Sequence, residues 1–260
     1  SGTITASGGG TYVWSTGAVT AALTQSPAAT TNYTVTVTSA AGCTATATGT
    51  ITVNPLPVAA VAGTNTICAG QSTTLTASGG GTYVWSTGAV TAAITPSPAA
   101  TTTYTVTVTS AAGCTATASR TVTVNPLPVA ASTSTAICAG QSGTITASGG
   151  GTYLWNTGAV TAALTQSPAA TTNYTVTVTS AAGCTATATG TITVNPLPVP
   201  APTSTTICPT QSGTITASGG GTYLWSTGAV TASITQSPAA TTSYTVTVTS
   251  AAGCTATATG

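Results

Sequence analysis

The sequence contains no aspartate, no glutamate and no histidine, and Arg120 is its only lysine or arginine. General acid–base catalysis needs a side chain that titrates near the working pH, and an activated nucleophile needs a neighbouring base. Neither can be built from this composition, so we expect that the protein is not an enzyme. Calcium loops and zinc sites also lack their usual ligands, and only thiolates remain for a metal. We therefore expect no cofactor and no metal site.

Charge is almost absent, with a formal net charge of +1 at pH 7. Without a surface that neutralises phosphates, nucleic acid is excluded as a specific partner. Little charge repulsion separates two copies of such a chain, so we expect self-association with neighbouring modules or chains, as in a fibre. Because almost nothing titrates, stability is expected to be nearly indifferent to pH between acid and mild base.

Long apolar runs are missing as well. The mean hydropathy is +0.40, but it comes from alanine and valine interleaved with threonine, serine and glycine. No apolar run approaches the ~18–20 residues that a spanning helix needs, so we expect no membrane span in this sequence. No charged and then apolar leader follows Ser1, so any secretion signal is expected to lie outside these residues.

What the sequence does have is a long repeat. Its four tryptophans stand in one short motif and are spaced 71, 70 and 70 residues apart. Solenoid repeats have periods of about 20–50 residues, so this longer period predicts a small domain with its own core in each repeat. The extended motif Val-Asn-Pro-Leu-Pro-Val separates the repeats. The predicted modules are module 1 (residues 1–54, first strand missing), module 2 (55–125), module 3 (126–195) and module 4 (196–260, last strand missing).

Within a repeat, apolar residues alternate with threonine. Residues 104–109 read Tyr-Thr-Val-Thr-Val-Thr, so the tyrosine and valines share one face of a strand and the threonines the other. Module 2 is expected to have strands at residues 64–68, 73–78, 83–85, 89–95, 104–109 and 114–124, with 89–95 forming one bent strand or two short ones. Six or seven short strands predict an all-β fold, a tandem array of small antiparallel β-sandwich (immunoglobulin-like) modules of about 70 residues.

The aromatic residues are the candidate core of each module. Each tryptophan follows a tyrosine by two positions, so both lie on one face of a strand. With no Phe and no Met in the chain, little else could fill the centre. The alternative is an aromatic platform that binds sugars. The predicted core residues are Trp14, Trp85, Trp155, Trp225, Tyr33, Tyr104, Tyr174 and Tyr244.

The seven cysteines predict disulfides and hence an oxidising, extracellular compartment. Six form pairs 46 residues apart, namely Cys68 with Cys114, Cys138 with Cys184 and Cys208 with Cys254, while the partner of Cys43 would lie before Ser1. Which cysteines can pair depends on whether an even or an odd number of strands lies between them. If residues 89–95 form one strand, each pair closes within its module. If they form two, the bridges join neighbouring modules, Cys68 to Cys184 and Cys138 to Cys254. We favour the bond within a module, because a domain this small needs its own cross-link.

Threonine rows on the outward face of neighbouring strands are a candidate contact surface. Thr105, Thr107 and Thr109 are expected beside Thr115 and Thr117. Such rows suit a solvated sheet face, and they also resemble the regular threonine arrays of ice-binding surfaces.

Several short motifs together resemble a known family. They are Cys-Ala-Gly-Gln-Ser at residues 68–72, Tyr-Val-Trp-Ser-Thr-Gly at 83–88, Ala-Gly-Cys at 112–114 and the Val-Asn-Pro-Leu-Pro linker. As a set they are similar to the immunoglobulin-like and PKD-like repeats of large surface proteins of gliding bacteria, including gliding-motility adhesins exported by type IX secretion. The resemblance implies a stalk or adhesin at the cell surface. Residues 86–88 replace an acidic turn of the PKD pattern, so calcium dependence is not implied.

The leading functional hypothesis is therefore a structural extracellular protein, either the repeat stalk of a cell-surface adhesin or the subunit of an extracellular fibre. A glycan-binding or ice-binding repeat module is the alternative, and surface glycans are then the second class of partner.

Overall fold

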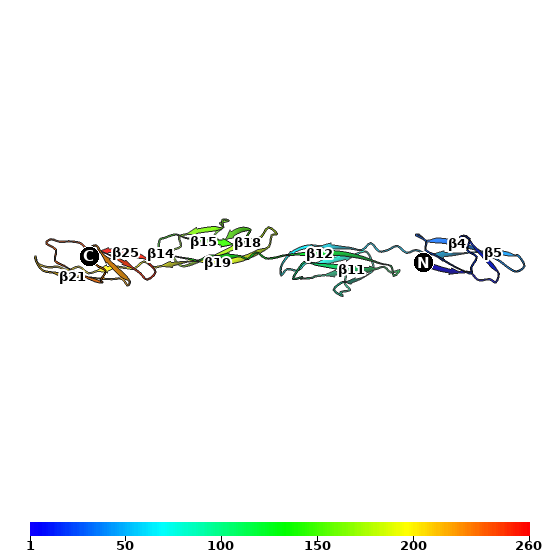
Figure 1. Cartoon of the computed structure of the whole chain (residues 1–260), viewed down its shortest axis with the longest axis horizontal. Coiled ribbons are helices and arrows are strands. Elements are labelled where there is room, and N and C mark those ends of the chain that lie inside the picture. Colours follow the sequence, from blue (N-terminus) through cyan, green and yellow to red (C-terminus); the bar gives the residue numbers. More distant parts are fainter. The chain divides into compact units, whose positions relative to one another are not determined.

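The computed structural model describes residues 1–260, which form strands and no helix (Figure 1). The predicted all-β class is confirmed. Since there are no helices, none is long and apolar enough to cross a membrane. The chain divides into two compact units, Ser1–Asn125 and Pro126–Gly260, which are described separately below.

Module 3, in the second unit, has two sheets. Their strand orders are β13-β15-β17 and β14-β19-β18-β16. Strand β14 pairs with β19 in parallel, and every other pairing in the module is antiparallel. Two packed sheets of three and four strands form a sandwich of the immunoglobulin type. The strands are β13 (Ala131–Ser132), β14 (Thr135–Cys138), β15 (Gly143–Ser148), β16 (Thr152–Trp155), β17 (Ala163–Gln166), β18 (Thr172–Thr179) and β19 (Thr185–Asn195).

Module 2, in the first unit, repeats this topology. Its sheets have the orders β10-β8-β6 and β7-β12-β11-β9, and β7 pairs with β12 in parallel. The strands are β6 (Ala60–Gly63), β7 (Thr66–Cys68), β8 (Leu75–Ser78), β9 (Thr82–Trp85), β10 (Ala93–Ile94), β11 (Thr102–Thr109) and β12 (Thr115–Asn125).

Modules 1 and 4 have fewer strands. Module 1 comprises β1 (Gly2–Thr5), β2 (Thr11–Trp14), β3 (Ala22–Gln25), β4 (Thr31–Thr38) and β5 (Thr44–Ile51), with no counterpart of β13 or β14. Module 4 comprises β20 (Ala201–Pro202), β21 (Gly213–Ser218), β22 (Thr222–Trp225), β23 (Ser233–Gln236), β24 (Thr245–Thr249) and β25 (Thr255–Thr259). Its residues 205–208, the counterpart of β14, are not in a strand. The strand that would pair with them is the one that module 4 lacks.

The alternating pattern produces the core. In β18, Val176 and Val178 are fully buried between the sheets, while the intervening threonines face outward. Ile145 and Leu164 of the other sheet close the core from the opposite side. Each module has a separate cluster of this kind around its tryptophan.

The connection between β16 and β17 differs from the expected strand at the equivalent residues 89–95. In module 2, only Ala93–Ile94 of that stretch is a strand. In module 3, β16 is antiparallel to β18, and β17 is antiparallel to β15. A tight Gly149–Gly151 reversal joins β15 to β16, so β16 and β17 run in the same direction. Residues 156–162 must therefore turn directly after Trp155 and run back past β16 without joining a full ladder. They are held instead by single bonds, such as the one from the Ala147 amide to the Ala162 carbonyl (2.8 Å).

The reversal itself requires glycine at one position. Gly151 has a φ of 133°, and a Cβ there would collide with the carbonyl oxygen of Thr179 on the neighbouring strand. Glycine allows both the conformation and the close approach of the two backbones.

One turn in module 4 is strained. Thr210 has a φ of 70° and is the only residue other than glycine with a positive φ, whereas its counterparts Gly70 and Gly140 both have a φ of 83°. A β-branched residue in this region costs about 1–3 kcal/mol. We expect Thr210→Gly to stabilise module 4 by about 1 kcal/mol, because relief of strain outweighs the added freedom of the unfolded chain.

Differential scanning calorimetry of the full chain measures this change as a higher melting temperature for module 4. The matched control is Gly140→Thr, which should destabilise module 3 by a similar amount. A lower melting temperature for Thr210→Gly would contradict the assignment of strain.

Candidate functional site

The tryptophan of each module is buried and its single polar atom is bonded. Trp155 is 1% exposed, and its indole Nε1 donates to the Thr161 carbonyl oxygen at 2.9 Å. The same bond joins each other tryptophan to the threonine six residues later: Trp14 to Thr20 at 2.8 Å, Trp85 to Thr91 at 2.9 Å and Trp225 to Thr231 at 2.9 Å. In module 3 this bond ties residues 156–162, called the crossing segment below, to the core. Buried indoles cannot stack on a sugar, so the aromatic platform is wrong for these residues.

The four tyrosines predicted for the core pack in or against the core of their modules. Tyr33, Tyr104 and Tyr174 are 8%, 7% and 7% exposed. Tyr244 is only partly buried, because the segment that covers its counterparts is missing from module 4.

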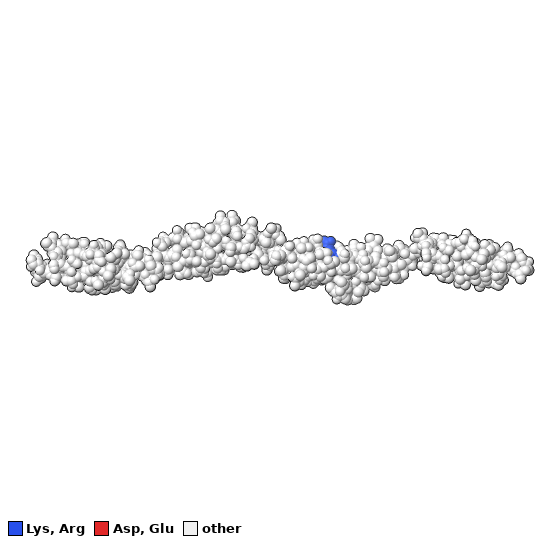
Figure 2. All heavy atoms as spheres, in the orientation of Figure 1, with Lys and Arg blue, Asp and Glu red and all other residues white.

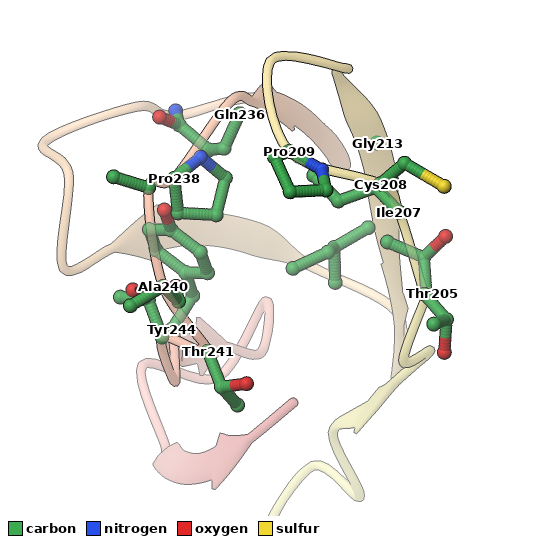
Figure 3. Close-up of a pocket in the computed structure, with 14 residues that line it drawn as sticks. Thr205, Ile207, Cys208, Pro209, Gly213, Gln236, Pro238, Ala240, Thr241 and Tyr244 are labelled. Atoms are coloured by element: carbon green, nitrogen blue, oxygen red, sulfur yellow. Dashed lines mark hydrogen bonds between the residues drawn. The ribbon is translucent and has the colours of Figure 1, made fainter.

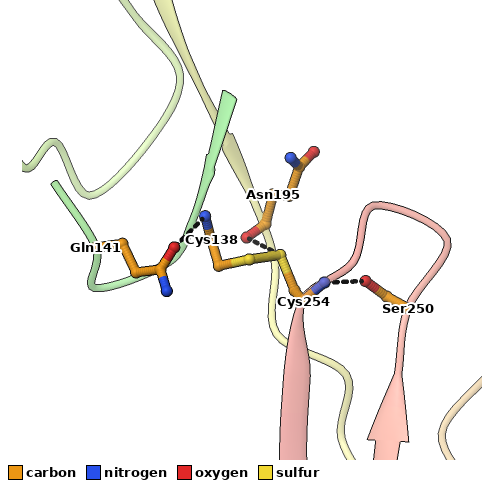
Figure 4. The surroundings of a disulfide bond; sticks show 5 residues. All are labelled: Cys138, Gln141, Asn195, Ser250 and Cys254. Atoms are coloured by element: carbon orange, nitrogen blue, oxygen red, sulfur yellow. Dashed lines mark hydrogen bonds between the residues drawn. A yellow bond between two sulfur atoms is a disulfide. The ribbon is translucent and has the colours of Figure 1, made fainter. Parts of the chain in front are cut away.

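The disulfide in the second unit joins two modules. Cys138 of module 3 is bonded to Cys254 of module 4, with a Cα–Cα distance of 5.5 Å and a sequence separation of 116 residues (Figure 4). The favoured bond within a module is therefore wrong, and for this pair the alternative between modules is right. Cys43, Cys114 and Cys208 are free thiols, so the expected partnerships of Cys114 and Cys208 within their modules are wrong too. The remaining two cysteines, Cys68 and Cys184, are disulfide-bonded.

The crossing segment is the physical reason for this pairing. Between β14 and β19 the chain makes five passes along the module, because residues 156–162 add a pass that is not a strand. An odd number of passes leaves Cys138 and Cys184 at opposite ends of module 3. Cys138 pairs across the sheet with Asn195, at the end from which the chain leaves for module 4.

The bridge spans the linker between the two modules. The Ala139 amide donates to the Asn195 carbonyl oxygen at 2.9 Å. The Cys254 Sγ lies 4.0 Å from that same oxygen (Figure 4). Each cysteine is held by a local turn, because the Cys138 amide donates to Gln141 Oε1 at 3.4 Å and the Cys254 amide to Ser250 Oγ at 3.2 Å. Together with the two prolines of the linker, the bond restricts bending between modules 3 and 4.

The first unit has half of the same arrangement. The Cys114 thiol donates to the Asn54 carbonyl oxygen at 3.8 Å, as Cys254 approaches Asn195, which is the counterpart of Asn54. Cys114 is a free thiol in the structure, and the position in module 1 that corresponds to Cys138 lies before Ser1.

The surface offers almost no charge. The blue patch in Figure 2 is Arg120, and no acidic side chain is present. Its guanidinium Nη1 donates to the Val61 carbonyl oxygen at 3.5 Å. The chain has no group of three or more histidine, cysteine or acidic residues that could hold a metal ion.

The outward threonine rows form as the pattern predicts, but they are not continuous. Thr107 pairs with Thr117 on one side and with Val84 on the other. Val84 is 50% exposed, so an apolar residue interrupts the hydroxyl array. Elsewhere the hydroxyls bond each other, as between Thr144 and Thr165 at 2.7 Å.

A groove opens in module 4 where the last strand is missing. It has a volume of about 280 Å³ and lies between residues 205–209 and residues 238–244 (Figure 3). Ile207, Ile215 and Tyr244 line it with apolar surface, and Cys208 stands at its rim. The sequence signalled this groove only through the incomplete last repeat.

The chain matches no protein-family model, and no curated protein matches it. Solved structures with some likeness include a Ca²⁺-stabilised adhesin of an Antarctic bacterium that binds ice. It has a TM-score of 0.35 and 19% identity, over 99% of this chain and 91% of that one. The ICAM-5 D1–D4 ectodomain has a TM-score of 0.41 and 14% identity, over 92% and 84%.

A third structure comes from a 1.5-MDa bacterial ice-binding adhesin. It has a TM-score of 0.29 and 15% identity, over 80% of this chain and 97% of that one. At these TM-scores and identities, the likenesses assign neither a ligand nor an activity to the chain. The fold rests on the strand order described above.

Proposed function

We propose that the protein is a structural extracellular protein, the repeat stalk of a cell-surface adhesin or the subunit of an extracellular fibre. The observation that carries this proposal is the Cys138–Cys254 bond, which joins two successive modules across a proline linker. A covalent tie at a module junction serves to transmit force and limit bending. Disulfides persist in oxidising compartments, which favours a location outside the cell.

The uncharged surface supports the same role. With one basic and no acidic side chain, copies of the chain repel each other little, and association with neighbouring modules or chains is the proposed partnership. A composition without aspartate, glutamate, histidine or lysine also favours a structural role over an enzymatic one. The proposal includes export by type IX secretion in a gliding bacterium. It also includes contact with surface glycans.

Immunogold electron microscopy tests the location and the form of the material together. An antibody against residues 1–260 should label threads or a surface layer on intact cells of the source organism. Permeabilised cells serve as the control for hidden protein. Label that appears only after permeabilisation would overturn the proposal, and label scattered singly over the surface would favour a stalk over a fibre.

A further inference from the structure

The outward face of the larger sheet has the same chemistry in every module. In module 3 it consists of the outward threonines of β18 and β19 together with Leu154 on β16, and we call this surface the threonine face. The only charged side chain of the protein is not on it, because Arg120 lies opposite Tyr104, which points into the core. The members of the face in module 3 are Thr152, Leu154, Thr175, Thr177, Thr179, Thr185, Thr187 and Thr189.

The hydroxyls at the centre of the threonine face have no partner within the chain. Thr177 lies directly opposite Thr187, but the two are not hydrogen-bonded. The same holds for the equivalent pairs Thr36–Thr46, Thr107–Thr117 and Thr247–Thr257. On the smaller sheet, by contrast, Thr144 is bonded to Thr165 at 2.7 Å. Its equivalents are Thr3–Thr24 at 2.8 Å, Thr74–Thr95 at 3.4 Å and Thr214–Thr235 at 3.0 Å. The threonine face thus keeps donors and acceptors for a partner outside the module.

One aliphatic side chain stands among these hydroxyls at the same place in each module. Leu154 pairs across the strands with Thr177 and is 53% exposed. Its counterparts are Val13 at 49%, Val84 at 50% and Leu224 at 52%. A partner that covers the face removes this aliphatic surface from water, which favours association.

The composition of the face decides which kind of partner fits. A charged polymer finds no opposite charge there. A sugar finds neither an exposed indole nor a carboxylate, because the tryptophans are buried and acidic residues are absent. A second copy of the chain presents the same uncharged, β-branched sheet surface, and two such sheets pack face to face at about 10 Å. A two-fold axis places the same patch on both partners, so each aliphatic side chain meets threonine methyl groups.

We propose that two copies of the chain associate laterally through their threonine faces. Leu154 of one copy packs against threonine methyl groups of the other, and the hydroxyls without a partner inside the module bond across the interface. This inference rests on the self-association proposed above and gives it a surface.

The size of the face determines how many modules take part. Three strands with three outward residues each cover about 280 Å² in one module. A stable interface buries about 800 Å² on each partner. One module is therefore too small to hold two copies together, and association requires several modules of each chain.

Lysine at the centre of the face tests the proposal in the full chain. The fourfold variant Thr36→Lys, Thr107→Lys, Thr177→Lys, Thr247→Lys places one cation on the threonine face of each module. Sedimentation velocity at a series of concentrations measures the dissociation constant. The unmodified chain should sediment as dimers or larger species. The variant should dissociate at about a hundredfold higher concentration, because like charges then meet across the interface.

A matched control places the same four charges on the smaller sheet. It is the variant Thr24→Lys, Thr95→Lys, Thr165→Lys, Thr235→Lys, and each of these positions is exposed. Both variants have the same net charge, so general repulsion weakens both equally, whereas only the first alters the proposed interface. The control should associate like the unmodified chain. Acrylamide should quench tryptophan fluorescence weakly in both variants, since the indoles are buried in folded modules.

Equal weakening by the two variants, or an unmodified chain that stays monomeric at millimolar concentration, would overturn the inference. A monomeric chain that produces thermal hysteresis would assign the face to ice instead. None of these results alters extracellular immunogold labelling, so failure of this surface and failure of the structural role can be told apart.

Discussion

Replacement of Trp155 by alanine is expected to destabilise module 3 by about 3–5 kcal/mol. The indole is 1% exposed, fills the centre of the core and holds the crossing segment through Thr161. A single core of this size rarely supplies more than about 3–5 kcal/mol, so the substitution removes most of what keeps the module folded. Hydrogen exchange of the full chain should show lost protection in β18 and β19 and retained protection in β11 and β12.

Two control variants separate the loss of the buried ring from the loss of its hydrogen bond and from a change at an exposed neighbour. Trp155→Phe keeps most of the ring volume but removes the indole N–H, so its cost should be the smaller part of the total. Leu154→Ala alters the neighbouring residue, which points outward and is 53% exposed, and should change stability by about 0.5 kcal/mol or less. Full protection of β18 in Trp155→Ala would show that the indole is not the core of the module.

Removal of the Cys138–Cys254 disulfide is expected to increase the maximum extension of the chain under force. When force is applied between Leu127 and Gly260, it passes through the Cys138–Cys254 bond, and the intervening stretch bears no load. The two cysteines are 116 residues apart, which corresponds to about 390 Å of extended chain. The double variant Cys138→Ser, Cys254→Ser should therefore extend about 390 Å further than the unmodified chain in single-molecule force measurements.

The control for this experiment is Cys208→Ser, which removes a free thiol and should leave the extension unchanged. The double variant is preferable to a reducing agent, because reduction also opens the bonds of Cys68 and Cys184. Equal extension of the double variant and the unmodified chain would mean that the bridge does not form in solution.

Much of the fold follows from the sequence because period-2 alternation determines the strands directly. The alternating stretch at residues 172–179 becomes β18, with its valines at the centre of the core. The incomplete ends of the array follow equally, since a repeat that lacks a strand in sequence lacks it in the sheet. The repeated tryptophan marks the core because no other residue type in the chain is as large, whereas the tyrosine two positions before it, such as Tyr153 before Trp155, is only partly buried.

The disulfide pairing could not be settled in this way. Cys138 is 46 residues from Cys184 and 116 residues from Cys254, and a periodic sequence repeats both spacings equally well. The choice depends on residues 156–162, which cross the module without forming a strand. Single bonds such as that from Trp155 Nε1 to Thr161 hold this segment, and they leave no alternating pattern to read. The number of passes along a module, and not the number of strands, decides where its cysteines lie.

The placement of the two cysteines at opposite ends of module 3 also bears on how such an array can change length over generations. A duplication or deletion of one whole repeat adds or removes one cysteine at each end of a module, so every interior junction still meets a matching pair. If each disulfide lay inside one module, repeats could be gained or lost just as readily. The junctions between modules would then have no covalent bond across them. Each repeat therefore encodes one module together with one cysteine for the junction at each of its two ends, as Cys138 and Cys254 show for the junction between modules 3 and 4.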